Sequence, residues 1–289
     1  MIQTEIALFC RNEATGLAKA VTRLCQQLEM LSETHRPIKL HLLENGSEDQ
    51  TGPIAQELAQ TLTGPFEIQV HLDLPAGKSR TWNYFISIAT APFLIFLDAD
   101  IQLDDNCLEH LLQTLNKESQ LALVGATPTL APDFKAQNFW QSVFALPYKA
   151  IAPAPSLAGG AYIARRHLLS PMPDDVINED LFLSLKHEES FELNPQAKFY
   201  VAPPKSLQTF IAQRTRILRS DQKERMRAPQ HDLNAHRRKG LKHLIPFYQQ
   251  GGLTRTVAFL MARTYAGALA QFTSPSEDKE GWNPASRNR

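Results

Sequence analysis

The sequence has few of the features that would place it in a specialised class of protein. Its three cysteines among 289 residues lack metal-ligand spacing and indicate reduced thiols, not a disulfide framework. Thirty basic and thirty acidic side chains cancel, so the overall charge gives no reason to expect a nucleic-acid partner. Residues 1–5 lack a secretory leader pattern, and no uncharged apolar run reaches the ~18 residues of a membrane-spanning helix. We expect a soluble, cytoplasmic protein that at most lies on the inner face of a membrane.

Two kinds of sequence pattern alternate along the first half of the chain. Short runs rich in branched and aromatic residues predict strands, at residues 6–10, 40–43, 66–72, 93–97 and 121–126. Apolar residues at helical spacing predict helices between them, at residues 17–31, 54–62, 82–89 and 108–115. Strands that alternate with helices across short turns indicate an α/β fold with a mostly parallel sheet.

The second half of the chain is less regular. The pattern predicts a helix at 139–148, a glycine-rich entry into a strand at 159–164, a strand at 198–202 and a long helix from residue 206. Apolar residues recur at helical spacing over 253–272, and the composition then turns polar. We therefore expect a main domain over 1–230, a helical extension over 231–273 and a disordered tail over 274–289.

The central predicted strand, at residues 93–97, ends abruptly in two aspartates. Asp98 and Asp100 stand one residue apart at its carboxyl end, which is where ligands bind in open α/β sheets. Two carboxylates this close repel each other unless a cation lies beside them, and Mg²⁺ or Mn²⁺ binds both carboxylate and phosphate oxygens. A polar strand end followed by the helix-starting acids Asp104 and Asp105 explains the same residues without a metal. The stretch by itself leaves both interpretations open.

A series of short motifs, weak singly but specific in this order and spacing, resembles the family 2 glycosyltransferases. These are inverting, nucleotide-sugar-dependent enzymes of the GT-A fold, and the resemblance covers roughly residues 6–219. It implies a Rossmann-like, mostly parallel mixed sheet flanked by helices, with a helical C-terminal extension and a catalytic domain over 1–230. The motifs are Arg11-Asn12-Glu13, Glu44-Asn45-Gly46-Ser47, Gly77-Lys78, Asp98-Ala99-Asp100, Gly159-Gly160-Ala161-Tyr162, Glu179-Asp180 and Gln213-Arg214-Thr215-Arg216.

The resemblance implies roles for the acidic motifs. Asp100 would bind the Mn²⁺ or Mg²⁺ that bridges the sugar diphosphate, and Asp98 would lie near the ribose. A metal stabilises the leaving nucleoside diphosphate as a Lewis acid while its charge grows. Asp180 matches the general base, which takes the proton of the acceptor hydroxyl, and Glu179 would support it. Acids that start a helix after an Asn178 cap are the alternative interpretation.

The resemblance also implies a set of residues that bind the nucleotide sugar. Glu44 and Asn45 stand where the family usually has two aspartates, and an asparagine offers a donor as well as an acceptor, so base preference stays open. Ile217 replaces the tryptophan of the polymer-forming branch, which argues against processive polymer synthesis. The alternative interpretation of the arginines in residues 213–216 is that they form a basic, solvent-exposed face of a helix. The expected binding set is Arg11, Glu13, Glu44, Asn45, Lys78, Asp98, Gly160, Gln213 and Arg216.

These patterns together predict an enzyme that moves a sugar from a nucleotide-diphosphate sugar to an acceptor hydroxyl with inversion. The acceptor stays open among glycan, lipid-linked and small-molecule classes. The alternative is a nucleotide-sugar-binding or scaffolding protein that has lost catalysis. A dehalogenase-type phosphatase is rejected because Gln102 stands where that motif has Thr or Val. The C-terminal helix would pack on the catalytic domain, form a homodimer or lie on a membrane, since Arg255 and Arg263 oppose spanning.

Overall fold

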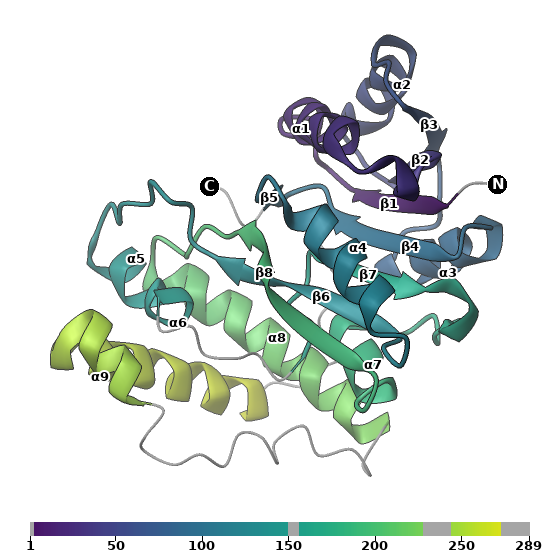
Figure 1. The fold of residues 1–289 in the computed structure, drawn as a ribbon. Helices are drawn as coiled ribbons and strands as arrows, with labels where there is room; N and C mark the ends of the chain where they lie inside the picture. The colour runs from purple at the N-terminus through teal and green to yellow at the C-terminus, as the bar shows by residue number, and fades with distance from the viewer. Residues whose placement is uncertain (1–2, 150–155, 228–243, 273–289) are drawn as a thin grey trace.

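A single eight-stranded mixed sheet forms the centre of the protein (Figure 1). The computed structural model describes residues 3–149, 156–227 and 244–272. The strand order is β3-β2-β1-β4-β7-β6-β8-β5, in which β1 to β4 run parallel and β7 is antiparallel to both neighbours. The strands are β1 (Thr4–Cys10), β2 (Ile38–Glu44), β3 (Phe66–His71), β4 (Phe93–Asp98), β5 (Gln102–Leu103), β6 (Leu123–Thr129), β7 (Ala161–Arg165) and β8 (Phe191–Tyr200).

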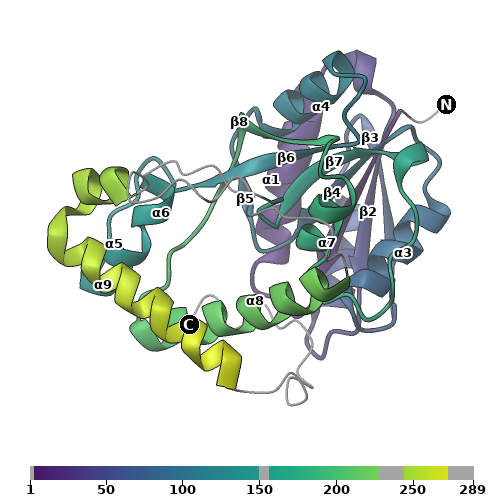
Figure 2. The same ribbon diagram turned by 90° about the horizontal axis from the view of Figure 1, so that it is seen from below.

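Helices cover both faces of the sheet (Figure 2). The apolar stripes of α1 (Leu17–Met30), α2 (Thr51–Thr61) and α4 (Cys107–Lys117) pack on one face. The helices α3 (Lys78–Ile88) and α7 (Glu179–Lys186) pack on the other, where Trp82 and Phe85 are fully buried. All seven residues of β1 are buried because the strand is covered on both sides. The short 3-10 turns η1 (Glu33–His35) and η2 (Arg166–Leu168) connect these elements.

A second layer of helices lies beside the β6–β8 side of the sheet. It consists of α5 (Phe139–Phe144), α6 (Leu146–Lys149), α8 (Leu207–Arg227) and α9 (Leu244–Phe272). Aromatic rings hold it together: Phe144 stacks on Phe210 with centroids 4.0 Å apart, and Phe259 lies 6.1 Å from Phe210. Gly252 breaks the helical backbone of α9 at φ 68°. Within the described residues, none of the helices combines the length and hydropathy needed to cross a bilayer.

The sequence predictions of strands and helices differ from the structure in three places. Strand β8 begins at Phe191 instead of residue 198, because a bulge beyond Asn194, whose side chain accepts the Gln196 amide hydrogen, interrupts the alternating pattern. The two-residue edge strand β5 gave no pattern to detect. The helix predicted at 139–148 is two helices, α5 and α6. Residues 231–243 and the expected tail at 274–289 lie outside the described residues.

A buried chain of titratable side chains joins the first three strands to α3. Glu5 accepts hydrogen bonds from the backbone of Thr90 and Ala91 and lies 3.1 Å from His41 Nε2. His41 Nδ1 is 2.9 Å from His71 Nε2, and His71 Nδ1 is 2.9 Å from the Tyr84 hydroxyl. Burial lowers the pKa of His71 to about 4, with the nearby positive charges of His41 and Lys39 acting in the same direction. The fold therefore holds His71 neutral.

We expect this buried row of side chains to make the protein less stable in mild acid. A histidine with a folded-state pKa of about 4 and an ordinary unfolded value near 6.5 stabilises the fold above pH 6.5. This contribution falls as the pH drops towards 4 and amounts to about 3 kcal/mol at most. The free energy of unfolding in urea should therefore differ less between pH 7 and pH 4.5 for His71→Gln than for the unsubstituted protein. The exposed His167, changed to Gln, is the matched control; an unchanged pH dependence in His71→Gln would contradict the prediction.

Candidate active site

The carboxyl ends of three parallel strands bring several of the predicted site residues to one edge of the sheet. In register, Cys10 of β1 lies opposite Glu44 of β2, and Phe9 lies opposite Asp98 of β4. The turns after these strands carry the Arg11-Glu13, Glu44-Asn45 and Asp98-Asp100 motifs. This edge is where open α/β sheets bind ligands.

A buried three-way ion cluster lies at this edge. Lys78, the first residue of α3, places its Nζ 2.7 Å from Asp98 Oδ1 and also pairs with Glu179 Oε1 at the start of α7. Both carboxylates are 5% exposed. Burial would lower the pKa of Lys78, but Asp98, Glu179 and Asp180 together raise it well above its usual value. The lysine therefore stays charged and ties α3, β4 and α7 together.

The glycine-rich segment before β7 lets Asp180 approach the backbone closely. Gly159 has φ +69°, and a Cβ atom placed there would lie 2.9 Å from Asp180 Oδ2. The carbonyl of Gly160, whose φ is +96°, accepts the backbone hydrogen of Asp98 at 2.9 Å. Since L side chains rarely adopt such φ values, glycine is required here. The segment links the end of β4 to the acid pair of α7.

The start of α7 is held by its cap and by the last turns of α8. Asn178 Oδ1 accepts the Leu181 backbone hydrogen, and Asn178 Nδ2 donates to Asp221 Oδ1 at 2.8 Å. The buried Glu224 accepts the Ile177 backbone hydrogen at 3.1 Å. The capping interpretation of Asn178 is therefore confirmed, and it is compatible with a chemical role of the acids that follow. A helix N-terminus also stabilises the charged form of carboxylates.

Sequence reasoning missed an aromatic pair beneath the acids. Trp82 Nε1 donates to the Tyr162 hydroxyl at 2.7 Å, and the Tyr162 ring stacks on Phe96 with centroids 4.7 Å apart. Burial, reinforced by the charges of Asp180 and Glu179, raises the pKa of Tyr162 well above its usual value. The hydroxyl therefore stays protonated and keeps a hydrogen that it can donate. In the sequence Tyr162 looked like an ordinary strand residue, so only its place in the Gly159–Gly160 motif could have pointed to it.

The turns after β1 and β2 are bonded to each other. The backbone N–H of Asn12 donates a hydrogen bond to Ser47 Oγ at 3.0 Å, and the backbone N–H of Glu13 donates one to Thr51 Oγ1 at 2.8 Å. Glu44 accepts the backbone hydrogens of Ser47 and Asp73, so its carboxylate holds two turns in place. Arg11, which precedes Asn12, is half-buried in the same turn.

Asn45 differs from its neighbours in these turns. It is 1% exposed, and neither atom of its side-chain amide has a hydrogen-bond partner among the described residues. A buried polar group without a partner costs about 1–3 kcal/mol. Its amide suits a ligand edge that presents both a donor and an acceptor.

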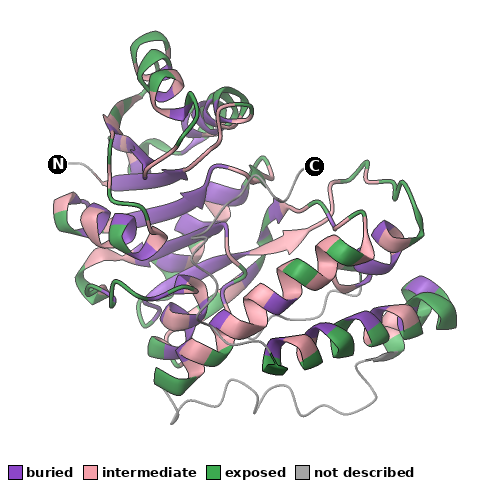
Figure 3. Ribbon diagram, turned by 180° about the vertical axis from the view of Figure 1, so that it is seen from behind, coloured by how far each residue is buried: buried purple, intermediate pink, exposed green. Residues whose placement is uncertain are grey.

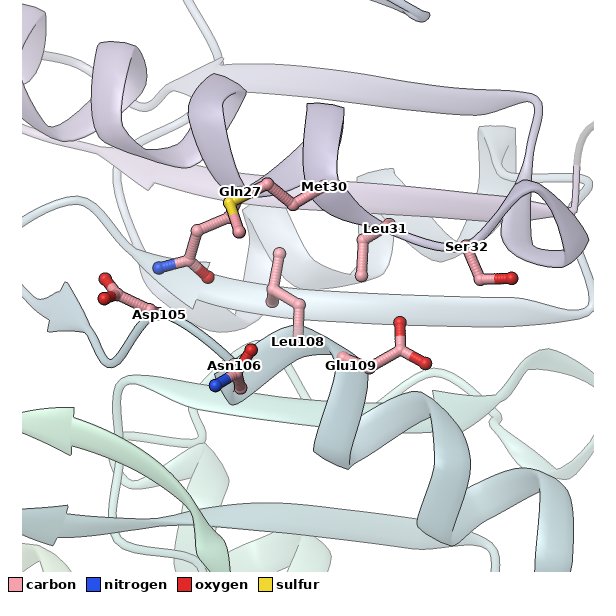
Figure 4. Close-up of a pocket in the computed structure, with 8 residues that line it drawn as sticks. All are labelled: Gln27, Met30, Leu31, Ser32, Asp105, Asn106, Leu108 and Glu109. Atoms are coloured by element: carbon pink, nitrogen blue, oxygen red, sulfur yellow. The ribbon is translucent and has the colours of Figure 1, made fainter.

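A cavity of about 340 Å³ opens beside Asp98 and Asp100, between α1 and the β4–β5 connection. Glu13, Lys19 and Arg23 also line it, so charges of both signs face the space. Its size is within the range of small-molecule sites. A separate pocket of about 240 Å³ between the end of α1 and the start of α4 contains none of the predicted site residues (Figure 4).

The residues at the end of β4 fit a metal ion that is shared with a substrate. Among the described residues, no group of three or more His, Cys, Asp or Glu side chains gathers into a metal cage. Asp98 forms an ion pair with Lys78, and Asp100 is half-buried just beyond the strand. Mg²⁺ and Mn²⁺ are commonly held by one or two carboxylates together with substrate phosphates. The donor set therefore fits an ion whose other ligands come from a phosphate-bearing substrate.

The basic motif at 213–216 lies in the middle of α8. Gln213 and Arg216 are both half-buried there. Thr215, between Arg214 and Arg216, is buried against α9, with its hydroxyl 3.4 Å from the Ala266 carbonyl. One side of this motif therefore packs in the helical layer, while the last turns of the same helix contact Ile177 and Asn178, just before α7.

Comparison with known proteins gives relatives in sequence. Residues 6–150, half of the chain, match glycosyl transferase family 2. Poly-β-1,6-N-acetyl-D-glucosamine synthase of Staphylococcus epidermidis is 24% identical over 223 residues, which are 72% of this chain and 52% of that protein. The chain therefore spans about half the length of the curated relatives it matches.

Solved structures share the fold at low sequence identity. Mannosyltransferase PcManGT from Pyrobaculum calidifontis, in complex with GDP-Man and Mn²⁺, has a TM-score of 0.61 and 17% identity, covering 95% of this chain and 76% of that one. TarS 1–349 of S. aureus, in complex with UDP-GlcNAc, has a TM-score of 0.51 and 13% identity, covering 92% and 87%. The expected GT-A-type sheet is thus confirmed. With the sequence match over half of its length, the chain belongs to glycosyl transferase family 2.

Proposed function

We propose that this protein transfers a sugar from a nucleotide-diphosphate sugar to an acceptor hydroxyl, with inversion and with the help of a divalent metal. The observation that carries the proposal is the convergence of Asp98, Glu179 and Asp180 around the buried Lys78 at one sheet edge, with Asp100 two residues beyond Asp98. Displacement with inversion needs one carboxylate that takes the proton of the attacking hydroxyl. Asp180 has that role in our proposal, and Glu179 and Lys78 fix the start of α7 on which it stands.

The donor would lie over the turns that follow β1, β2 and β4. Asp100 would hold Mn²⁺ or Mg²⁺, which supplies Lewis-acid stabilisation of the leaving diphosphate when bound. Asn45, buried and without a protein partner among the described residues, would bind the edge of the base. Arg11, Glu13, Glu44, Gly160, Gln213 and Arg216 complete the proposed binding set. Guanidinium groups suit diphosphate oxygens.

The relatives support this proposal without fixing the substrates. PcManGT was solved with GDP-Man and TarS with UDP-GlcNAc, so the fold accommodates more than one base. The S. epidermidis relative is named for a polysaccharide product, and we propose a glycan hydroxyl as the acceptor. Ile217, in place of the tryptophan of the polymer-forming branch, favours transfer of single sugars.

We expect donor binding to need both a metal and one class of nucleotide. Thermal shift against UDP-, GDP- and dTDP-sugars, each with and without Mn²⁺, measures this, because a ligand at a hundredfold excess over Kd stabilises the fold by about 2.7 kcal/mol. The shift should vanish in Asp100→Ala and remain in the control Asp105→Ala, whose side chain is exposed five residues further on. NMR of the product should then show an inverted anomeric centre. A metal-independent shift, or a product with retained configuration, would contradict the proposal.

A further inference from the structure

The segment that leads into α7, residues 172–178, is held on one side by α3. Ser79 Oγ donates a hydrogen bond to the Asp174 carbonyl at 2.8 Å. Asn83 donates to the Met172 carbonyl at 2.8 Å and accepts the Met172 backbone hydrogen at 2.9 Å. We call this stretch the entry segment, because the acid pair of α7 follows it directly.

The last two turns of α8 hold the entry segment on its other side. Lys223 donates to the Asp175 carbonyl at 2.8 Å, and Arg227 pairs with the Asp175 carboxylate. Glu224 Oε1 accepts the backbone hydrogen of Ile177 at 3.1 Å. Figure 2 shows the end of α8 beside α7. The entry segment is therefore fixed between two helices before the acids begin.

Glu224 differs from the other charged residues of α8. It is 1% exposed, and only Thr215 and Ser220 are also buried among the 21 residues of this helix, most of which are half-buried or exposed in Figure 3. Burial raises the pKa of Glu224, and Arg227 Nε lies 3.2 Å from its Oε2. A buried ion pair commonly adds little net stability, because desolvation offsets the attraction. The contact with the Ile177 backbone therefore explains the buried carboxylate better than stability does.

We propose that Glu224 is a positioning residue that fixes the direction of Asp180. The inference rests on the proposed function, in which Asp180 takes the proton of the acceptor hydroxyl. Ile177 stands three residues before Asp180, and its side chain is 58% exposed, so the hydrogen bond to Glu224 holds this point of the chain and side-chain packing does not. A catalytic group displaced by about 1 Å can lose a factor of about 10² in rate.

Two substitutions of Glu224 test whether its oxygen positions the base. Glu224→Leu should lower kcat about 10–100-fold with little change in the KM for the donor, because the donor site is untouched. Glu224→Gln keeps an oxygen for the Ile177 backbone hydrogen and should stay within about threefold of the unsubstituted rate. Gln222→Leu, at an exposed position of the same turn, is the matched control. Release of nucleoside diphosphate, from the UDP-, GDP- or dTDP-sugar that gives the thermal shift, measures both constants.

A double-mutant cycle shows whether Glu224 acts through Asp180. In the Asp180→Asn background, Glu224→Leu should change the remaining rate by less than about twofold, because the base whose direction it sets is gone. Equal losses in both backgrounds, or equal losses in the Leu and Gln variants, would overturn the inference. If Asp180→Asn loses its rate and Glu224→Leu keeps it, the inference fails while the proposed function stands.

Hydrogen exchange tests the same contact without any measurement of activity. Amide hydrogens of residues 176–183 should exchange at least about tenfold faster in Glu224→Leu than in the unsubstituted chain or in Gln222→Leu, while those of α1 keep their rates. Unchanged exchange at 176–183 would overturn the inference. A chain that turns over no donor would contradict the proposed function, and faster exchange at 176–183 would still support Glu224 as the residue that fixes the entry segment.

Discussion

Asp180→Asn is expected to lose about 10²–10⁴-fold in kcat while the Kd for the donor changes little. The asparagine keeps the size of the side chain and its fit against Gly159. Asp180 Oδ2 lies 2.9 Å from the point where a Cβ atom on residue 159 would be. It cannot take a proton from the acceptor hydroxyl, and general-base catalysis contributes a factor of this order. Initial rates at saturating acceptor, together with calorimetric titration of the donor in the presence of Mn²⁺, measure the two quantities separately.

The control for this prediction is a nearby acid outside the site. Glu189→Gln changes an exposed carboxylate just after α7 and should keep full activity. If Asp180→Asn keeps a tenth or more of the unsubstituted rate, Asp180 is not the base. If neither protein turns over any donor although both bind one tightly, the scaffolding alternative gains support.

Lys78→Met is expected to destabilise the protein by about 3–5 kcal/mol, because it leaves buried carboxylates without their cation. Asp98 and Glu179 are each 5% exposed and both pair with this lysine. Domains of ordinary stability have only about 5–15 kcal/mol in total, so the variant would be marginal. Urea unfolding measures the loss. Lys117→Met, at the exposed end of α4, should change the free energy of unfolding little.

A combined variant separates the electrostatic cost from the loss of function. When Asp98→Asn and Glu179→Gln accompany Lys78→Met, neither side chain that pairs directly with Lys78 is left charged, and most of the stability should return. Donor turnover should not return, because the acids are gone. A loss below 1 kcal/mol in Lys78→Met, or no recovery in the triple variant, would show that the ion cluster does not stabilise the fold as described.

Local patterns in the sequence predicted the architecture well. Continuous apolar runs located β1, β2 and β4, because both faces of these strands are covered, and apolar residues at helical spacing located the helices between them. The abrupt change from apolar residues to Asp98 marked the functional edge of the sheet. The family resemblance supplied the order of the motifs along the chain.

Contacts between distant residues could not be predicted in the same way. Nothing near Lys78 in the sequence indicates that it would lie between Asp98 and Glu179, and Asn178 is 43 residues from the Asp221 that holds it. The buried Glu5–His41–His71 chain likewise depends on strand register. Strand β8 was predicted too short because its bulge interrupts the alternation on which the prediction relied.

The ion cluster around Lys78 has a consequence for how such a chain changes in evolution. Loss of Lys78 would harm folding before selection could act on the missing activity, whereas loss of Asp180 leaves the buried charges paired. A lineage that abandoned catalysis is therefore expected to lose Asp180 early. It would keep Lys78, Asp98 and Glu179 as a set or replace them together by neutral side chains. Descendants that kept Lys78 would retain this buried part of the ancestral active site.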